Sequence, residues 1–194
     1  DEITSIVVSD GVTKVGAFAF YGLSNLTSVT LSDTVASIGG YAFKNCVKLT
    51  DINLPTGMKK IGESAFYGCS NIWSLTYNAI NAECESFMEP NAPLEKIVIG
   101  DKVRRLPNGI FSGREFTEVA LPSCLERIDD YAFSGCENLT TINLSDSIRY
   151  IGDNAFYGCS SLKNIHWPLR LTTIGNYAFR QTALETISLP EGVT

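Results

Sequence analysis

The stretch "IGESAFYGCSNI" at residues 61–72 decides the fold, because the chain nearly repeats it as "IGDNAFYGCSSL" at residues 151–162. Taken alone, the first copy resembles an amphipathic helix that carries a reactive cysteine. A near-copy in the same chain indicates instead that each stretch is one unit of a repeat array. Every unit of such an array keeps the same residue types for the same structural reason.

The unit recurs along the whole chain with a nearly constant period. One apolar marker residue recurs at steps of 22 or 23 residues, except for one step of 45 that contains an irregular unit. A phenylalanine follows five residues after each marker, and Phe87 is predicted to take that place in the irregular unit. The spacing predicts about eight units of 22–24 residues. The markers are Val15, Ile38, Ile61, Leu106, Ile128, Ile151 and Ile174, and the phenylalanines are Phe20, Phe43, Phe66, Phe111, Phe133, Phe156 and Phe179.

Each unit is predicted to contain two extended pieces and a helical turn. Residues 139–144 alternate apolar and polar side chains, which predicts a short strand with one buried face. A turn follows, and residues 148–151 form a second extended piece. The next stretch, residues 153–159, is too short for an independent helix and predicts one or two helical turns capped by Asp153 or Asn154. Such a unit cannot bury its apolar face alone, so the units stack on one another.

Together these residues resemble the BspA-like class of leucine-rich repeat, whose units run close to "L-x-x-I-x-L-P-x-x-[VI]-x-x-I-G-x-x-A-F-x-x-C-x-x-L". The resemblance covers residues 1–194 and implies an α/β, strand-rich solenoid. It implies a single domain built as a right-handed stack of leucine-rich repeats, with short helical turns and a strand-lined concave face. Two features depart from the pattern: the irregular unit, at about residues 77–105, lacks the "IG" step, and Pro107 follows Leu106 where the pattern has glycine. Because the repeat is already running at both ends, we expect a fragment of a longer protein.

The resemblance also implies a location and a kind of function. BspA-like repeats are commonly found in bacterial surface proteins that bind other macromolecules, so the resemblance implies an extracellular or cell-surface, adhesion-type module. The sequence opens at "DEITSIVVSD", without the basic and apolar regions of a signal peptide. The expected location therefore rests on the resemblance alone.

Composition narrows the classes of partner. The chain has 194 residues, of which 44% are hydrophobic, as is typical of a globular protein. Its formal net charge of −6 disfavours a nucleic-acid partner, which requires a strongly basic face. No apolar run approaches the length of a membrane span. We expect a monomeric module with no nucleic-acid partner and no membrane span.

The six cysteines follow the repeat and show no pairing pattern. Four of them share one phase, so their side chains point in the same direction in neighbouring units and do not face each other as a disulfide requires. We predict buried free thiols for this row. Zinc is disfavoured because C-x-x-C is absent and His166 is the only histidine. The row consists of Cys46, Cys69, Cys136 and Cys159, whereas Cys84 and Cys124 fall outside it and are the candidates for exposed thiols.

No catalytic constellation follows from the residue types. His166 is the one imidazole and is predicted to face the open side of a strand, away from any activated nucleophile. The glycines belong to the repeat and form no phosphate-binding loop. Asp129 and Asp130 are adjacent at a turn, where solvated charge or capping is the simpler explanation. We expect no catalytic, cofactor-binding or metal-binding residues, and therefore neither an enzyme nor a cofactor.

The outward face of the predicted strands is the candidate ligand surface. Most outward positions are small and polar, but Trp73 stands at a phase otherwise held by Thr, Glu or Lys, so its indole is predicted to be at least half exposed. Beside it, Pro90 and Pro93 predict a loop that leaves the stack, and loops on rigid scaffolds often carry recognition. The equal alternative is that Trp73 folds under residues 77–93 and covers a packing defect. The ligand-binding candidates are Trp73, Ser74, Thr76, Tyr77, Lys96, Glu118 and His166.

A basic stripe follows the second extended pieces of this otherwise acidic chain. One interpretation is a solvated face that blocks edge pairing between sheets, and the other is an anion site. The stripe consists of Lys14, Lys59, Lys60, Arg104, Arg105, Arg127 and Arg149.

Two functions from different classes fit the sequence. The first is a non-catalytic module that binds a protein or glycan ligand through the concave sheet or the irregular unit. The second is a structural spacer that holds another domain of the same protein away from a surface. Trp73 and the irregular unit favour binding, because a spacer has no need to break its period.

Overall fold

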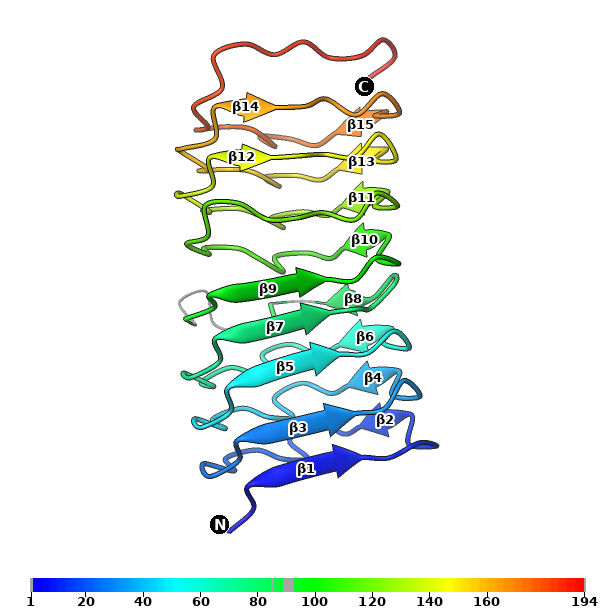
Figure 1. Cartoon of the computed structure of the whole chain (residues 1–194), viewed down its shortest axis with the longest axis vertical. Helices are drawn as coiled ribbons and strands as arrows, with labels where there is room; N and C mark the ends of the chain where they lie inside the picture. Colours follow the sequence, from blue (N-terminus) through cyan, green and yellow to red (C-terminus); the bar gives the residue numbers. More distant parts are fainter. Residues whose placement is uncertain (1, 85, 89–92, 194) are drawn as a thin grey trace. The chain divides into compact units, whose positions relative to one another are not determined.

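The computed structural model describes residues 2–84, 86–88 and 93–193. The chain divides into two compact units, Asp1–Gly100 and Asp101–Thr194, and each is described by itself below. Both units are parallel β-solenoids, in which each coil of the chain adds a rung to two ladders of strands (Figure 1). The solenoid predicted from the period is therefore confirmed.

Unit 1 contains a front row and a back row of strands, and every pairing among them is parallel. The front strands have four residues each and the back strands two. The front strands are β1 (Ser5–Val8) and β3 (Ser28–Leu31), which pair with each other, and β5 (Asp51–Leu54), β7 (Ser74–Tyr77) and β9 (Lys96–Ile99), which form one sheet. The back strands are β2 (Lys14–Val15), β4 (Ser37–Ile38), β6 (Lys60–Ile61) and β8 (Glu83–Cys84), joined in that order.

Unit 2 has the same two rows with shorter front strands. Its front strands are β12 (Thr141–Ile142) and β14 (Asn164–Ile165), and its back strands are β10 (Arg105–Leu106), β11 (Arg127–Ile128), β13 (Tyr150–Ile151) and β15 (Thr173–Ile174). Around β12 the predicted alternation is confirmed, because Leu139, Ile142 and Leu144 are buried while Thr141 and Asn143 are exposed.

The register places equivalent residues of successive coils side by side. Ile128 pairs with Ile151 in unit 2, and Ile61 pairs with Cys84 in unit 1. The irregular unit thus keeps its place in the back sheet, with Cys84 at the marker position that the sequence pattern left unassigned. Of the two candidates for exposed thiols, Cys84 is therefore buried, and Cys124 alone is partly exposed.

The stretch predicted as helical turns contains no helix among the described residues and is instead a series of tight turns. Its backbone N–H groups alternate between two kinds of acceptor. An α-helix requires these groups to bond within the segment, so hydrogen bonds between coils exclude it. Ala42, Lys44 and Cys46 donate to the carbonyl three residues earlier, whereas Tyr41, Phe43 and Asn45 donate to Glu63, Ala65 and Tyr67 of the next coil.

Two backbone features explain why the turn segment repeats so closely. Asn154, which precedes an Ala-Phe pair, has a left-handed φ of 53°, which interrupts any helix at this point. Asp153 is no helix cap, because its carboxylate accepts the backbone N–H of Asn176 in the next coil at 2.6 Å. At Gly62 a Cβ would lie 2.4 Å from the backbone nitrogen of Gly40, so the "IG" glycine recurs because adjacent coils approach closely there.

Stacked phenylalanines form the centre of each unit. The ring centroids of Phe43 and Phe66 are 5.0 Å apart with an interplanar angle of 4°, and those of Phe133 and Phe156 are 5.1 Å apart at 5°. Phe87 takes its predicted place in the irregular unit, but its ring meets Phe66 edge-on, at 6.3 Å and 80°. Both geometries are favourable for aromatic pairs.

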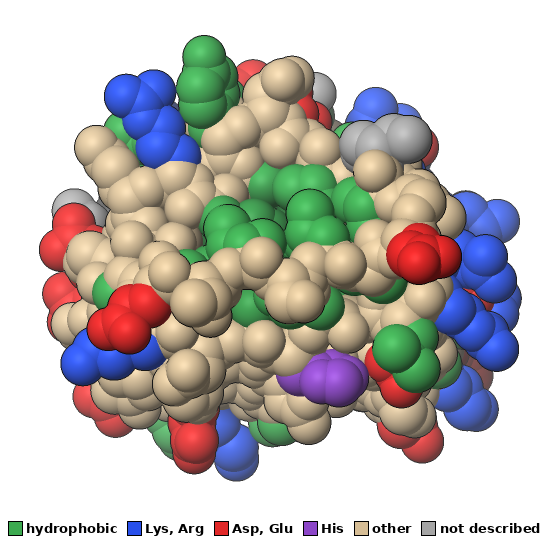
Figure 2. Space-filling view, turned by 90° about the horizontal axis from the view of Figure 1, so that it is seen from above, with side chains coloured by type: hydrophobic (Ala, Val, Ile, Leu, Met, Phe, Trp, Pro, Cys, Tyr) green, Lys and Arg blue, Asp and Glu red, His purple; other side chains and the backbone are tan. Residues whose placement is uncertain are grey.

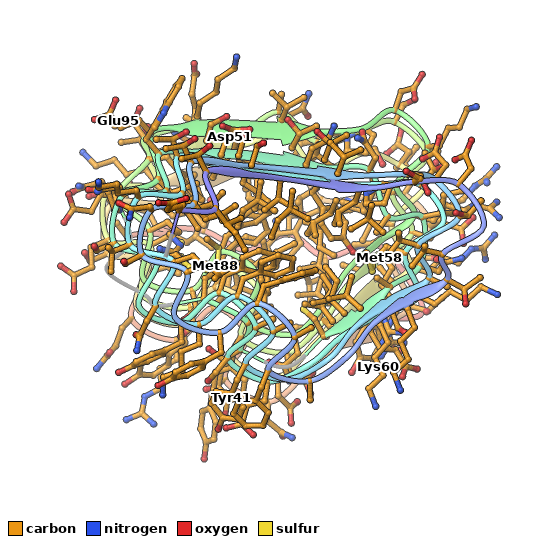
Figure 3. The ribbon with its side chains drawn as sticks, turned by 90° about the horizontal axis from the view of Figure 1, so that it is seen from below. Tyr41, Asp51, Met58, Lys60, Met88 and Glu95 are labelled. Carbon is orange, nitrogen blue, oxygen red and sulfur yellow. The ribbon has the colours of Figure 1, made fainter. Side chains whose placement is uncertain are left out.

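A view along the stack separates the apolar interior from the polar surface. Figure 3 shows the side chains of Met58 and Met88 inside the coil and those of Tyr41, Lys60 and Glu95 on its outside. Met58 is 2% exposed and Met88 is 5% exposed, so the irregular unit also contributes to the core.

The four in-phase cysteines are buried free thiols, as predicted. Their thiols donate weak hydrogen bonds to main-chain carbonyls of the preceding coil, such as Cys69 Sγ to Phe43 O at 3.0 Å and Cys159 Sγ to Phe133 O at 3.1 Å. Burial raises the pKa of Cys136 and of Cys159 to about 12. Cys136 and Cys159 therefore remain protonated at neutral pH.

We predict that Phe66→Ala lowers the free energy of unfolding by about 3–5 kcal/mol, because it leaves a cavity in the aromatic column. Tyr67→Ala is the matched control, since Tyr67 is the next residue and is 44% exposed, and we expect a loss of less than about 1 kcal/mol. Urea denaturation followed by circular dichroism measures both. Equal losses would contradict the assignment of the phenylalanine column to the core.

We predict that denatured protein titrates as six free thiols without reductant, while native protein reacts rapidly only at Cys124. Reducing agent should leave the melting temperature unchanged. Native labelling that disappears in Cys124→Ser confirms the site of reaction. Fewer than six thiols in the denatured, unreduced protein would indicate a disulfide.

Candidate functional site

Trp73 occupies a rigid position where the chain enters front strand β7. Its backbone N–H donates to Thr50 O at 3.0 Å, and its carbonyl accepts the N–H groups of Glu95 and Lys96, each at 2.9 Å. The indole is 45% exposed, slightly less than the half predicted from the sequence. A large aromatic surface is therefore held at the rim of the front sheet by bonds to both neighbouring coils.

Two predicted ligand-binding residues on β7 lie below the surface. Ser74 is only 9% exposed, because the register places it between the longer side chains of Asp51 and Lys96. Tyr77 is fully buried, since its partner Leu54 belongs to the core column. Tyr77 thus offers no surface to a ligand. The sequence did contain a signal for this burial, because the equivalent position in other units is held by a leucine such as Leu54.

The other candidates of the front sheet are accessible. Thr76 is partly exposed between Asn53 and Val98, and Lys96 is exposed on β9. Thr76 and Lys96 therefore offer polar groups on the front sheet of unit 1, and Trp73 lies at the end of the same sheet where the chain enters β7. The part of the predicted loop that contains Pro90 lies outside the described residues.

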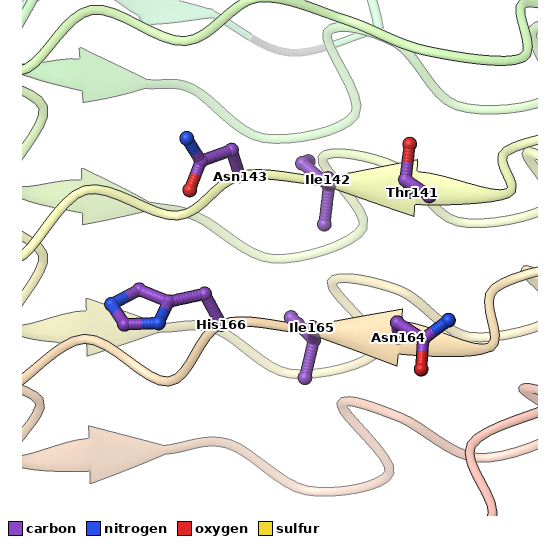
Figure 4. A pocket seen from close by; sticks show the side chains of 6 residues that line it. All are labelled: Thr141, Ile142, Asn143, Asn164, Ile165 and His166. Carbon is purple, nitrogen blue, oxygen red and sulfur yellow. The ribbon is translucent and has the colours of Figure 1, made fainter.

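Unit 2 holds the remaining two candidates, Glu118 and His166, both of which are exposed. His166 lies at a shallow depression of about 400 Å³ between β12 and β14 (Figure 4). Its Nε2 is 3.4 Å from Asp146 Oδ1, and both side chains are more than half exposed. The depression is lined by Thr141, Ile142, Asn143, Asn164, Ile165 and His166.

The carboxylate beside His166 is fixed by the backbone. Asp146 accepts the N–H of Leu169 at 3.1 Å, and this bond, with a smaller contribution from His166, lowers the pKa of Asp146 below its ordinary value. No group of three or more potential metal ligands occurs in the part of the chain that the structure describes. The depression offers hydroxyl, amide and imidazole groups suited to hydrogen bonding with a polar ligand.

A charged network on the back sheet of unit 2 was missed by sequence analysis. Asp129 is 5% exposed, although a turn carboxylate was expected to be solvated. Arg105 Nε lies 2.5 Å from its Oδ2, and Arg127 Nε donates to its Oδ1. The guanidinium of Arg127 also lies 3.6 Å from the ring centroid of Tyr150. Basic side chains gather on one side of the face seen in Figure 2.

An exposed aromatic cluster on the turns of unit 1 was also missed. Phe18 stacks on Tyr41 with centroids 5.1 Å apart, and Lys44 Nζ lies 5.1 Å from the ring centroids of both Tyr41 and Tyr67. The only sequence signal is that aromatics recur on either side of the Ala-Phe pair. In a single unit these aromatic residues are expected to be solvent-exposed and isolated, and only the stacking of coils places them in contact.

Comparison with known proteins settles the family. The BspA type leucine-rich repeat region matches in six copies over residues 1–114 and 81–194. The chain belongs to this family. No curated protein matches the chain significantly.

The chain is also similar to several proteins of known structure. A leucine-rich repeat protein of T. pallidum is similar with a TM-score of 0.50 and 26% identity, over 88% of this chain and 72% of that one. A leucine-rich cell surface protein of Faecalibacterium prausnitzii has a TM-score of 0.43 and 22% identity over 85% of this chain, which spans 60% of that protein. The pneumococcal vaccine antigen PcpA has a TM-score of 0.44 and 18% identity, over 98% of this chain and 57% of its own.

The described residues of this family member contain no helix long and apolar enough to cross a membrane.

We predict that Asp129→Ala lowers the free energy of unfolding by about 1–3 kcal/mol, because two guanidinium groups lose a buried carboxylate. Glu126→Ala is the matched control in the same coil. Glu126 pairs with Arg104 at 2.8 Å, but both side chains are about half exposed, so we expect less than about 1 kcal/mol. Chemical denaturation measures both variants, and a smaller loss for Asp129→Ala than for Glu126→Ala would contradict a structural role for the network.

Proposed function

We propose that this chain is a non-catalytic binding module of a bacterial cell-surface protein, and that it contacts a protein or glycan ligand through the front sheet around Trp73. The observation that carries the proposal is the exposed indole on a backbone fixed by both neighbouring coils. Tryptophan presents a large, rigid contact area and one N–H donor, which is the chemistry of an interaction anchor.

The surface around Trp73 supports this function. Thr76 adds a hydroxyl on β7 itself, and the flanking strands add the ammonium group of Lys96 on β9 and the carboxylate of Asp51 on β5. Polar groups of this kind around an aromatic anchor can pair with a partner while the indole is desolvated. Because parallel strands fix the backbone in register, the backbone itself loses little conformational freedom when a ligand binds.

The cell-surface location and the adhesion-type role rest on membership of the BspA type leucine-rich repeat family. A leucine-rich solenoid is typically a scaffold for binding and not for catalysis, and the depression beside His166 in unit 2 is shallow, as suits a binding surface. The spacer function remains the alternative, and the regular stacking of the phenylalanine columns favours it.

We predict that Trp73→Ala weakens binding by about 2 kcal/mol or more, roughly thirtyfold, with little change in stability. The measurement is binding to an array of defined glycans and purified secreted proteins, followed by titration of each ligand found. Trp167→Ala is the matched control: Trp167 is partly buried and its ring contacts Phe179 edge-on at 5.0 Å, so its loss should lower stability and leave affinity unchanged.

Two results would overturn the proposal. If the wild-type protein binds nothing on the array, the spacer function is favoured. If Trp73→Ala lowers stability while the folded fraction binds each ligand as tightly as before, Trp73 has a packing role and the binding surface lies elsewhere.

A further inference from the structure

The back sheet of unit 2 holds an arginine in a fixed geometry. Arg127 lies on β11, and its Nε donates to the carboxylate of Asp129, whose side chain is only 6% exposed. Its guanidinium lies 3.6 Å from the ring centroid of Tyr150 in the next coil. A surface arginine normally samples many rotamers, but here an ion pair and an aromatic face restrict it.

The fixed arginine keeps part of its binding capacity. A guanidinium has five N–H donors, and the bond to Asp129 uses only Nε. The side chain of Arg127 is 43% exposed, and no further partner is found for it among the described residues. Its terminal nitrogens can therefore donate two parallel hydrogen bonds to an external carboxylate, sulfate or phosphate group.

Two further arginines lie in the coils before and after Arg127, at the position that Glu126 holds in its own coil, one residue away from Arg127. Arg149 is exposed in the coil after Arg127, and within the described part of the chain its guanidinium has no hydrogen bond or ion pair. Arg104 is exposed in the preceding coil, where it pairs with Glu126. We name Arg104, Arg127 and Arg149 the arginine strip. With Arg105, Glu126 and Asp129 it contains four arginines and two carboxylates, a surplus of two positive charges on a chain whose net charge is −6.

We propose that the arginine strip binds the anionic groups of a linear acidic polysaccharide, with Arg127 and Arg149 as the principal contacts. A linear polymer lying along the stack meets one coil after another, and neighbouring back strands are about 4.8 Å apart. Its carboxylate or sulfate groups can thus contact arginines on successive coils. The strip belongs to unit 2 and Trp73 to unit 1, so the two proposed sites share no residue.

The chemistry of the strip favours a polysaccharide over a protein or a nucleic acid. The apolar residues of its strands, Leu106, Ile128 and Ile151, are all fully buried, so a peptide would find no apolar anchor there. Exposed Thr172 in the next coil donates its hydroxyl to Arg149 O at 2.9 Å and so helps to fix the backbone of the strip. A single-stranded nucleic acid binds through aromatic rings on which its bases stack, and the guanidinium of Arg127 already covers the ring of Tyr150 beside the strip.

The test measures binding of the 194-residue chain to three oligosaccharides of equal length by fluorescence anisotropy at two salt concentrations. Oligogalacturonate carries carboxylates, a heparin fragment carries sulfates, and fully methyl-esterified oligogalacturonate is the neutral control. We expect the wild-type protein to bind at least one charged oligosaccharide but not the ester, with affinity falling as salt rises. The oligosaccharide that binds more tightly identifies the anionic group.

Variants then locate the site. We expect Arg149→Gln to weaken binding about tenfold or more, and Arg127→Lys to weaken it although the charge is kept, because an ammonium cannot make the bidentate contact. Lys163→Gln removes one exposed charge elsewhere in unit 2 and should change nothing. Arg149 has no partner in the described residues, so its variant stays informative even if Arg127 variants unfold, which thermal denaturation checks.

Several outcomes would overturn the proposal. These are failure to bind either charged oligosaccharide, equal binding of the methyl ester, or an equal effect of Lys163→Gln. Tighter binding of polyglutamate or single-stranded DNA of matched charge would assign the strip to another class of partner. Trp73→Ala should leave this binding intact, so failure here and failure of the front-sheet function are distinguishable.

Discussion

The hydrogen bonds between successive coils are the interaction on which the rest of this structure depends. Along the back strands, N–H groups donate to the preceding coil, as Gly62 does to Ile38 O at 2.8 Å, whereas in the turn segment they donate to the following coil, as Phe43 does to Ala65 O at 2.8 Å. The backbone N–H and C=O groups of an interior coil therefore find all their hydrogen-bond partners only when both neighbouring coils are present. This requirement fixes the register, and the register in turn aligns equivalent side chains into columns.

Alignment into columns determines both the core and the surface. Inside, it brings phenylalanine rings to about 5 Å from each other and places each in-phase thiol under a carbonyl of the coil before it. Outside, each side chain borders the equivalent side chains of the coil before and the coil after. A substitution in one coil therefore changes the surroundings of residues in both neighbouring coils. Arg127 illustrates this, because its partners come from its own coil and the next one. A solenoid of this kind can therefore acquire a binding surface without any change to its backbone.

The repeat period predicted the parts of the fold that depend on residues within one unit. The markers, the phenylalanine column and the row of free thiols all followed from phase, because each repeats the same local environment. The helical turns were wrong because the competing acceptors belong to the next coil, and a local pattern contains no information on them. Ser74 was misplaced for a similar reason: its burial comes from Asp51 and Lys96 on the flanking strands. Tyr77 was an avoidable error, since its phase is that of Leu54.

Residues with a left-handed backbone conformation show that hydrogen bonding between coils also determines the structure of the exposed turns. The residue before each Ala-Phe pair has a positive φ, which costs a residue with a side chain roughly 1–2 kcal/mol and costs glycine almost nothing. Gly109 holds the equivalent position before Ile110 and Phe111 in one coil, yet Phe18 and Tyr41 hold it in two others. Their rings stack at 5.1 Å with an interplanar angle of 14°, an arrangement that contributes roughly 0.5–1.5 kcal/mol and offsets part of the strain. Ser64 and Asn154 hold the same conformation without an aromatic side chain, so ring stacking offsets the strain at Phe18 and Tyr41 but is not required for it. The contact between these two rings is nevertheless a product of stacking, because it forms only between neighbouring coils.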